Sequence, residues 1–249
     1  MNYTDLAGKI VLITGGSRGI GKEIVKYFAE SGAHVFATYA TSHDEARDIQ
    51  AEYESQLKDV TFIKCDVRSR GDIRSVMALI EQKFGRLDVL VNNAGINNPT
   101  NFDEITDEDW DNIMAVNLRG PFICSQEALR LMVNSGSIVH ISSVSGQYGG
   151  PRTAHYAASK AGLISLGQVI ARFGAAQGVR SNSVAAGLIN SEMASKGAQN
   201  AAVRKASENI VLARFGEFAE VANVVGFLAS DASSYITAQT LNVNGGLYF

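Results

Sequence analysis

The chain has 249 residues, a formal net charge of -3 and an apolar fraction of 46%. The length suits one large α/β domain with an ample core, and the charge provides no basic surface for nucleic acid or an anionic membrane. The N-terminus lacks a signal-like pattern and no later run reaches about 18 apolar residues, so we expect a cytosolic protein.

Residues 9–14 form an apolar, strand-like run, which is followed by glycines and then by helical periodicity. Glycines at 15, 19 and 21 would let the backbone approach a pyrophosphate, and the free N–H groups of a helix start attract an anion. The spacing Gly-x-x-x-Gly-x-Gly differs from the Gly-x-Gly-x-x-Gly dinucleotide fingerprint, so the turn alone does not identify the ligand. It predicts a phosphate site at the start of the first helix.

The second predicted strand, residues 34–39, ends where a dinucleotide fold contacts the adenosine ribose. An acid about 20 residues past the glycine turn would bond to the 2′-hydroxyl of NAD and repel a 2′-phosphate. This chain has no acid there, and Tyr39, Thr41 and Ser42 stand near that place. Arg18 in the glycine turn could reach the same phosphate, although a lone arginine is often merely solvated. The pattern favours NADP(H) as the cofactor.

Apolar periodicity predicts further helices and strands in the middle of the chain. Asp66, after the third strand, would either cap the following helix or meet the edge of an adenine ring. Cys65 and Cys124 are isolated thiols on apolar segments, which indicates buried small hydrophobes, and we expect no metal site. The predicted elements are a helix at 44–56, a strand at 60–67, a helix at 73–84, a strand at 87–91 and a long helix at 104–133.

Residues 143–160 bring a serine, a tyrosine and a lysine into one short stretch. A helix after Pro151 would place Tyr156 and Lys160 four residues apart on one face, with the ammonium beside the phenol. An adjacent cation lowers the pKa of a phenol from its usual value of about 10, which makes tyrosine a usable proton donor. Ser143 ends a strand-like run, at the edge where open α/β sheets carry their chemistry. An ordinary exposed pair on an amphipathic helix would show the same Tyr-x-x-x-Lys spacing.

Strands and helices alternate along the chain, which argues for parallel strands. We expect an α/β fold, a Rossmann-type doubly wound sheet of seven parallel strands with helices on both faces. Residues 1–249 would form a single dinucleotide-binding catalytic domain, with a mobile substrate flap at about 187–208, where small and polar residues predominate. The remaining elements are a strand at 136–143, a helix at 153–177, a strand at 179–185, a helix at 218–229 and a strand at 240–243.

These residues together resemble the short-chain dehydrogenase/reductase family. The similarity covers essentially the whole chain, and its motifs are TGGSRGIG at 14–21, NNAG at 92–95, Asn117, Ser143, YAASK at 156–160 and the segment 214–246. Three features are most similar to the 3-oxoacyl-carrier-protein reductases: the run SRGIG, the tail FLASDASSYITAQTLNVNGG and the missing acid after the second strand.

The resemblance implies reduction of a ketone to a secondary alcohol by hydride transfer from NADPH, with a 3-oxoacyl thioester or related β-keto compound as substrate. Tyr156 would be the general acid, Lys160 would lower its pKa and hold the nicotinamide ribose, and Ser143 would bond to the substrate carbonyl. Asn117 would hold a water that passes protons to Lys160. The implied cofactor-binding residues are Gly15, Ser17, Arg18, Gly19, Ile20, Gly21, Tyr39, Thr41, Ser42, Cys65, Asp66, Val67, Asn93, Ala94, Gly95, Tyr156, Lys160, Gly187, Ile189 and Ser191.

Some positions depart from the family pattern. Ala186 and Gly187 stand where the family usually has Pro-Gly, and loss of the fixed φ should loosen the entrance to the flap. Phe173 replaces a common glutamate on a face used for subunit pairing, and we expect a homotetramer. Residues 134–135 and Gln177 lack the basic character typical of carrier-protein reductases at those places, so an acidic carrier protein would find less to hold.

The sequence leaves two other functions open. One is a dehydrogenase of a free secondary alcohol, sugar or small ketone, and the other is a non-catalytic NADP-binding regulatory protein. An acyl carrier protein stays a candidate partner, whereas no nucleic-acid or membrane partner is expected. The complete set of Asn, Ser, Tyr and Lys counts against the regulatory protein, because a protein that only binds the cofactor has no need of an activated phenol.

Overall fold

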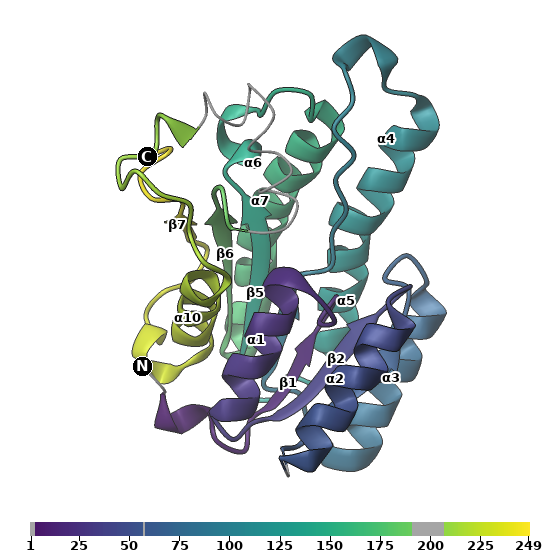
Figure 1. Cartoon of the computed structure of the whole chain (residues 1–249). Coiled ribbons are helices and arrows are strands. Elements are labelled where there is room, and N and C mark those ends of the chain that lie inside the picture. Colours follow the sequence, from purple (N-terminus) through teal and green to yellow (C-terminus); the bar gives the residue numbers. More distant parts are fainter. Residues whose placement is uncertain (1–2, 57, 191–206) are drawn as a thin grey trace.

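A seven-stranded parallel sheet organises the molecule, in the strand order β3-β2-β1-β4-β5-β6-β7 (Figure 1). The computed structural model describes residues 3–56, 58–190 and 207–249. Strand β1 pairs with both β2 and β4, so the chain order changes direction at β1, which is where open α/β sheets bind their ligands. The strands are β1 Ile10–Ile13, β2 His34–Tyr39, β3 Val60–Lys64, β4 Val89–Asn92, β5 Gly136–Ser143, β6 Val179–Ala186 and β7 Thr240–Val243.

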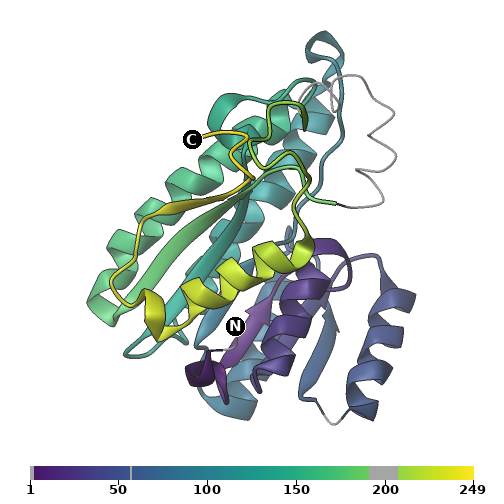
Figure 2. The ribbon, with the colours of Figure 1, turned by 60° about the vertical axis from the view of Figure 1, so that its left-hand side comes forward.

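Alternating residues of the strands build two apolar cores, one on each face of the sheet. The helices described are α1 Gly19–Glu30, α2 His43–Ser55, α3 Arg70–Phe84, α4 Asp107–Met114, α5 Gly120–Ala128, α6 Ser145–Tyr148, α7 Ala154–Gly174 and α10 Phe218–Ala229. Val11 and Ile13 of β1 pack with α1, α2 and α10, whereas Ile10 and Leu12 pack with α3, α5 and α7. Figure 2 shows α10 crossing the sheet on the face opposite α7. Burial on both faces explains why β1 is apolar throughout.

The predicted seven parallel strands and their flanking helices are confirmed, but the helical segment at 104–133 differs from the prediction. It begins at α4, where Thr106 and Asp109 form a capping box: the Thr106 Oγ1 accepts the Asp109 N–H at 3.1 Å, and the Asp109 carboxylate accepts the Thr106 N–H at 3.3 Å. These two bonds satisfy the first N–H groups of the helix and fix where it starts.

A π-helical stretch, Ala115–Arg119, separates α4 from α5. Pro121 has no N–H to donate to the carbonyl oxygen of Asn117, so the regular ladder of the α-helix is interrupted at this point. The N–H of Gly120 instead bonds to the carbonyl oxygen of Ala115, five residues back. Asn117 therefore lies in a local break of the helix.

Strand β6 runs one residue past its predicted end, through Ala186, which pairs with Ser143 on one side and Val243 on the other. Alanine, unlike proline, keeps an N–H and can stay in a ladder. The loosened flap predicted at 187–208 falls mainly on residues 191–206, outside the described part of the chain. Of the helices described, none combines the length and apolarity that a membrane crossing requires.

Gly226 lies in α10 where this helix packs on α1, and a Cβ there would lie 2.2 Å from the Tyr27 ring. We predict that Gly226→Ala lowers the free energy of unfolding by about 1–3 kcal/mol, because overpacking outweighs the gain in helix propensity. Gly71→Ala in α3 is the matched control, since its Cβ would meet the Ser69 Oγ only at 3.7 Å. Urea denaturation compares the two variants, and equal midpoints would contradict the packing argument.

Candidate active site

The turn after β1 is bonded directly to the turn after β4. Asn93 donates from Nδ2 to the carbonyl oxygens of Thr14 at 2.9 Å and Gly15 at 2.8 Å. The backbone N–H groups of Asn93 and Ala94 both donate to the Thr14 Oγ1 at 3.0 Å. A Cβ on Gly21 would lie 2.1 Å from the Gly15 carbonyl oxygen, so only glycine fits where the helix meets this turn. Two segments assigned to the cofactor site by sequence are thus in contact.

The start of α1 presents backbone donors beside this turn. The helix begins at Gly19, and its N-cap residue Arg18 is extended and forms no side-chain cap bond. The N–H groups of the first helical turn have no partner within the helix and attract anions. Ser17 is buried under the turn, while Arg18 is exposed above it. A tight glycine turn with free N–H groups fits the pyrophosphate of a dinucleotide.

The carboxyl end of β2 lies against the same glycine turn. The N–H of Gly16 donates to the Thr38 carbonyl oxygen at 2.8 Å. Tyr39 ends the strand, and its hydroxyl bonds to Nδ1 of His43, the first residue of α2, at 2.8 Å. Thr41 and Ser42 lie in the turn between them. Sequence reasoning missed His43, because its contact with Tyr39 forms across a turn and no spacing rule predicts it.

Asp66 does not cap α3, which resolves one of the two alternatives that the sequence left open. The cap is Ser69, whose Oγ accepts the Asp72 N–H at 3.2 Å. The Asp66 carboxylate instead accepts the NH2 of Arg68 at 2.7 Å and the Arg68 backbone N–H at 2.9 Å. The side-chain bond from Arg68 lowers the pKa of Asp66, so the residue is an anion at neutral pH.

The two thiols are confirmed as buried, unpaired side chains. Burial raises the pKa of Cys65 to about 12, so its thiol is protonated and unreactive at neutral pH. Val67, two residues on, is buried against Gly120, where an added Cβ would lie 3.0 Å from its Cγ2. Both residues line the segment after β3 as apolar packing groups.

Ser143, Tyr156 and Lys160 converge where β5 ends against the first turns of α7. Ser143 is the last residue of β5, and its Oγ accepts the Ser145 N–H at 3.1 Å. The Ser143 side chain is close enough to the Tyr156 phenol to lower its pKa. The Lys160 ammonium lies 5.7 Å from the centre of the Tyr156 ring and donates to the Ile141 carbonyl oxygen at 2.7 Å. The predicted i, i+4 relation of Tyr and Lys on one helix is present.

Asn117 joins this group from the π-helical stretch. Its side-chain amide bonds to both backbone groups of Ile96, accepting the N–H and donating to the carbonyl oxygen at 2.9 Å each. The same Nδ2 lies 3.2 Å from the Ser159 Oγ. A Cβ on Gly95 would meet the Asn117 Oδ1 and the Lys160 Nζ, each at 3.4 Å. The NNAG turn therefore lies directly above the asparagine and the ammonium.

The pKa of the phenol differs in direction from the sequence-based expectation. Burial raises the pKa of Tyr156, and the hydrogen bond with Ser143 opposes that rise. Lys160, only 4% exposed, has its own pKa lowered by burial to about 8. Its ammonium points to the Ile141 carbonyl oxygen and to the face of the ring. This explains why burial, and not the ammonium, sets the direction of the pKa shift of Tyr156. At neutral pH the phenol therefore carries its proton.

A buried polar network around His140 lies beside Lys160. Nδ1 of His140 bonds to the Asn92 side-chain amide and its Nε2 to the Ser181 Oγ, both at 3.2 Å. Burial, and then the charge of Lys160, lower the pKa of His140 to about 3, so the imidazole is neutral. The run GSIVHISS predicted only a strand, because nothing in it reveals which neighbours face the histidine.

The segment after β6 contains three predicted cofactor residues, and the structure describes two of them, Gly187 and Ile189. The Gly187 N–H donates to the Val243 carbonyl oxygen at 2.9 Å, and a Cβ on Gly187 would lie 2.6 Å from the Asn244 Cβ. Ile189 forms an isolated parallel bridge with Gly216. Ser191 lies outside the described residues. The chain leaving β6 is thus held to the segment that follows β7.

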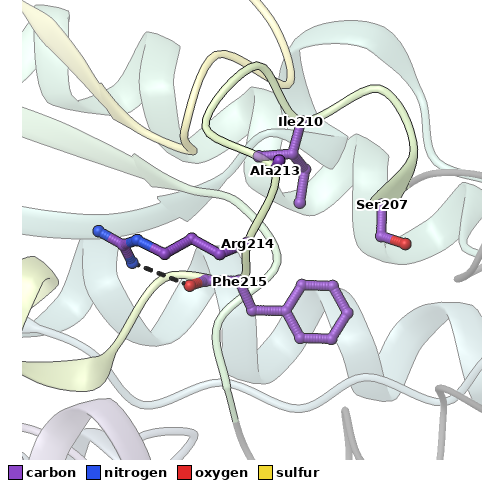
Figure 3. A pocket seen from close by; sticks show the side chains of 5 residues that line it. All are labelled: Ser207, Ile210, Ala213, Arg214 and Phe215. Atoms are coloured by element: carbon purple, nitrogen blue, oxygen red, sulfur yellow. Dashed lines mark hydrogen bonds between the residues drawn. The ribbon is translucent and has the colours of Figure 1, made fainter.

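A small pocket of about 250 Å³ lies near the C-terminal segment (Figure 3). Arg214, on its rim, forms two bonds to the Glu220 carboxylate at 2.6 and 2.9 Å, and that carboxylate also accepts the Glu217 N–H at the start of α10. This ion pair fixes one wall of the pocket. Ser143, Tyr156 and Lys160 are not among the residues that line the pocket. The lining residues are Ser207, Ile210, Ala213, Arg214 and Phe215.

The change of strand order at β1, the glycine turn and the Ser-Tyr-Lys cluster define the class of dinucleotide-binding α/β enzymes. A protein-family profile described as Enoyl-(Acyl carrier protein) reductase matches residues 15–248. The 3-oxoacyl-(acyl-carrier-protein) reductase FabG of Staphylococcus aureus is 40% identical over 242 residues, covering 96% of this chain and 98% of that protein. FabG of Thermotoga maritima is 42% identical over 244 residues, covering 97% of this chain and 98% of that protein.

Solved structures agree with the profile. A chain assigned as a short-chain alcohol dehydrogenase from Sinorhizobium meliloti superposes with a TM-score of 0.91 at 35% identity, covering 98% of both chains. The crystal structure of gox2181 has a TM-score of 0.93 at 30% identity, with the same coverage. The chain belongs to the short-chain dehydrogenase/reductase family and is an oxidoreductase acting on CH–OH or C=O groups.

The buried ammonium of Lys160 should destabilise the fold. A pKa of about 8, against 10.5 for an ordinary lysine, corresponds to a penalty of the order of 3 kcal/mol. Below pH 8 the group is charged in both states and the folded protein bears the whole penalty. Between about pH 8 and 10.5 the unfolded chain binds more protons, so the stability of the wild type rises with pH.

We therefore predict that Lys160→Met is more stable than the wild type at neutral pH, with an advantage that shrinks above pH 8. Urea denaturation at neutral and alkaline pH measures it. Lys26→Met, which removes an exposed lysine of α1, is the control and should show no such pH dependence. A Lys160→Met protein less stable than the wild type at pH 7 would contradict the expected penalty.

Proposed function

We propose that this protein reduces the 3-keto group of an acyl thioester to a secondary alcohol with NADPH. The observation that carries the proposal is the convergence of Ser143, Tyr156 and Lys160 at the carboxyl end of β5, with the ammonium 5.7 Å from the centre of the phenol ring. The 3-oxoacyl-(acyl-carrier-protein) reductases that share about 40% of its sequence support the choice of substrate class.

In this mechanism the nicotinamide, when bound, supplies a hydride to the carbonyl carbon. The hydroxyls of Ser143 and Tyr156 donate hydrogen bonds to the carbonyl oxygen and stabilise the negative charge that develops there. Tyr156 then transfers its phenolic proton to that oxygen, so the C=O group becomes CH–OH. Lys160 stabilises the resulting phenolate, because its ammonium lies against the same ring. Because Pro121 has no N–H for the carbonyl oxygen of Asn117, that oxygen is free to take part in passing protons to Lys160.

The choice of NADPH rests on the end of β2. No carboxylate follows Tyr39 that would bond to a ribose 2′-hydroxyl, and Arg18 is exposed beside the glycine turn that contacts this strand. Thr41 and Ser42 add hydroxyl donors. Equal dissociation constants for NADPH and NADH would remove this part of the proposal.

The family description and the relatives' names differ in the bond that is reduced, C=C in one and C=O in the other. Two hydroxyls that converge on one point suit a carbonyl oxygen, which accepts two hydrogen bonds, and thus favour the keto substrate. A panel of 3-oxoacyl, trans-2-enoyl and free secondary-alcohol substrates separates the alternatives. Turnover confined to the enoyl thioester or to free alcohols would overturn the assignment.

Tyr156→Phe should reduce turnover by about a hundredfold or more, because it removes the positioned proton donor. Binding of NADPH should stay nearly unchanged, which fluorescence titration checks. Tyr148→Phe is the matched control, since this exposed tyrosine of α6 stacks on Tyr248 and not on the catalytic group. Turnover of Tyr156→Phe like that of the wild type would exclude the mechanism.

An acidic carrier protein would find few unpaired basic residues near positions 134–135 and 177. Arg180 is tied up, since it donates to the carbonyl oxygens of Leu228 at 2.9 Å and Ser230 at 3.1 Å. Arg130 is exposed but bonded to Glu127 at 2.9 Å, and Arg172 is exposed on α7. The expected long-range attraction is therefore weak.

We predict that a CoA-linked 3-oxoacyl substrate is reduced about as efficiently as the carrier-linked form. Steady-state kinetics with both substrates, at low and high salt, measure the ratio of catalytic efficiencies. A strong preference for the carrier-linked form that collapses at high salt and in Arg130→Ala or Arg172→Ala would show that the two arginines do hold the carrier. Arg47→Ala, an exposed arginine of α2, is the control.

The assembly that we propose is a homotetramer with two-fold axes. A groove of about 630 Å³ runs between α4, α5 and α7, and apolar side chains including Leu118, Phe122 and Val169 line it. Phe173 is 77% exposed at the end of the same helix α7. A second copy would bury these side chains, as a self-complementary interface requires. The aromatic C-terminus, with Phe249 exposed, offers a second contact.

Phe173→Glu should weaken this assembly, because it puts a charge into an apolar interface. Light scattering at micromolar concentration should give a tetramer for the wild type and smaller species for the variant. Phe102→Glu, at an exposed site before α4, is the control. A monomeric wild type would refute the proposed assembly.

A further inference from the structure

The corner between β2 and α2 holds a histidine that the proposed function has not used. The Tyr39 hydroxyl bonds to the His43 Nδ1 at 2.8 Å, and the two ring centres are 5.7 Å apart. The His43 N–H donates to the Thr41 carbonyl oxygen at 2.9 Å, which fixes the turn that carries the ring. Tyr39 is buried and His43 is exposed. The imidazole is therefore held on one side and open to solvent on the other.

This corner adjoins the glycine turn. The Gly16 N–H bonds to the Thr38 carbonyl oxygen at 2.8 Å, and a Cβ on Gly16 would lie 2.8 Å from the Ala37 Cβ. A dinucleotide whose pyrophosphate lies at the start of α1 thus brings its adenosine ribose to the end of β2. His43 follows that end by four residues.

The bond to Tyr39 leaves Nε2 as the free edge of the ring. In the neutral imidazole the phenol donates to Nδ1 and Nε2 carries the proton, so Nε2 is a donor. In the imidazolium Nδ1–H donates to the phenol oxygen instead, and Nε2–H still points outward as a donor. Both charge states keep the ring in place, so protonation changes the charge at this corner without changing its geometry.

The charges around the corner are mixed. On β3, Lys64 is paired in register with Tyr39 and is exposed. On α2, Asp44 lies 3.5 Å from Arg47, and the Asp66 carboxylate after β3 is bonded to Arg68. The charged groups on the elements packed at this corner are Arg18 and Lys22 of the glycine turn and α1, Asp44, Glu45 and Arg47 of α2, Lys64 of β3, and Asp66 and Arg68 after it.

We propose that His43 is a specificity-determining residue that donates from Nε2 to the 2′-phosphate of NADPH and takes up a proton from solvent when that phosphate binds. The inference rests on the proposed use of NADPH. A dianionic phosphate stabilises an adjacent imidazolium, and histidine is the side chain that changes charge between pH 5 and 8. NADH lacks the phosphate and gains nothing from this proton.

The test compares dissociation constants of NADPH and NADH for the wild type and His43→Gln between about pH 6 and 8.5. Glutamine keeps a donor but does not titrate. We expect His43→Gln to weaken NADPH binding by about threefold to tenfold near pH 6.5 and to leave NADH binding unchanged. The difference between the two proteins should shrink as the pH rises, because a neutral imidazole and a glutamine each offer the phosphate an uncharged donor. Protonation of the phosphate on the free cofactor is common to both titrations and cancels in the comparison.

Calorimetry of NADPH binding in two buffers of different ionisation enthalpy gives the number of protons taken up. Uptake near pH 7 should be smaller in His43→Gln than in the wild type, while His34→Gln, at the opposite end of β2 beside Asp59, should match the wild type. If the wild type prefers NADPH, and His43→Gln keeps both this preference and the proton uptake, the proposed role of His43 is wrong. The choice of NADPH as the cofactor would still stand. A wild type that binds NADPH and NADH equally overturns the cofactor choice as well.

Discussion

The buried ammonium of Lys160 is the constraint to which the catalytic end of the molecule is fitted. Among the described residues the ammonium donates to the Ile141 carbonyl oxygen, and the neighbouring His140 is kept neutral. The Ser142 Oγ bonds to the Lys160 carbonyl oxygen at 2.9 Å, which ties α7 to β5. Gly146 lets α6 approach, since a Cβ there would lie 2.7 Å from the Lys160 backbone. Thus β5, α6 and α7 together hold a buried charge that lowers the stability of the fold.

A protonated phenol above a protonated amine suits reduction better than oxidation. Burial raises the pKa of Tyr156 and so keeps the proton that a developing alkoxide needs. The same burial lowers the pKa of Lys160 to about 8, so the ammonium can also give up its proton near neutral pH. Proton delivery then depends on the bonds around the pair, above all that of Ser143, rather than on a tyrosinate formed in advance.

The local patterns of the sequence were sufficient for most of the fold. Apolar runs predicted the central strands, because a parallel strand buried on both faces is apolar throughout, as β1 is. The Tyr-x-x-x-Lys spacing placed both side chains on one helix face, since helical neighbours depend only on spacing. The direction of the pKa shift of Tyr156 was predicted wrongly, because it depends on how the folded chain buries the phenol and on Ser143 of the preceding strand. The π-helical break came from Pro121, a residue whose effect falls on Asn117, four positions earlier.

The proposed pyrophosphate and adenosine sites differ in how much a motif says about them. At the pyrophosphate turn two motifs bond to each other, as Asn93 does to Thr14 and Gly15, so they constrain one another. At the adenosine end the sequence offers one rule, an acid or no acid after β2, and absence of an acid does not say what stands in its place. In this chain a tyrosine at the strand end holds the ring of His43, a relation that appears only when the turn is folded. Cofactor preference in such folds is therefore best read from the contacts that orient the exposed side chains, since those contacts decide which of them can reach the phosphate.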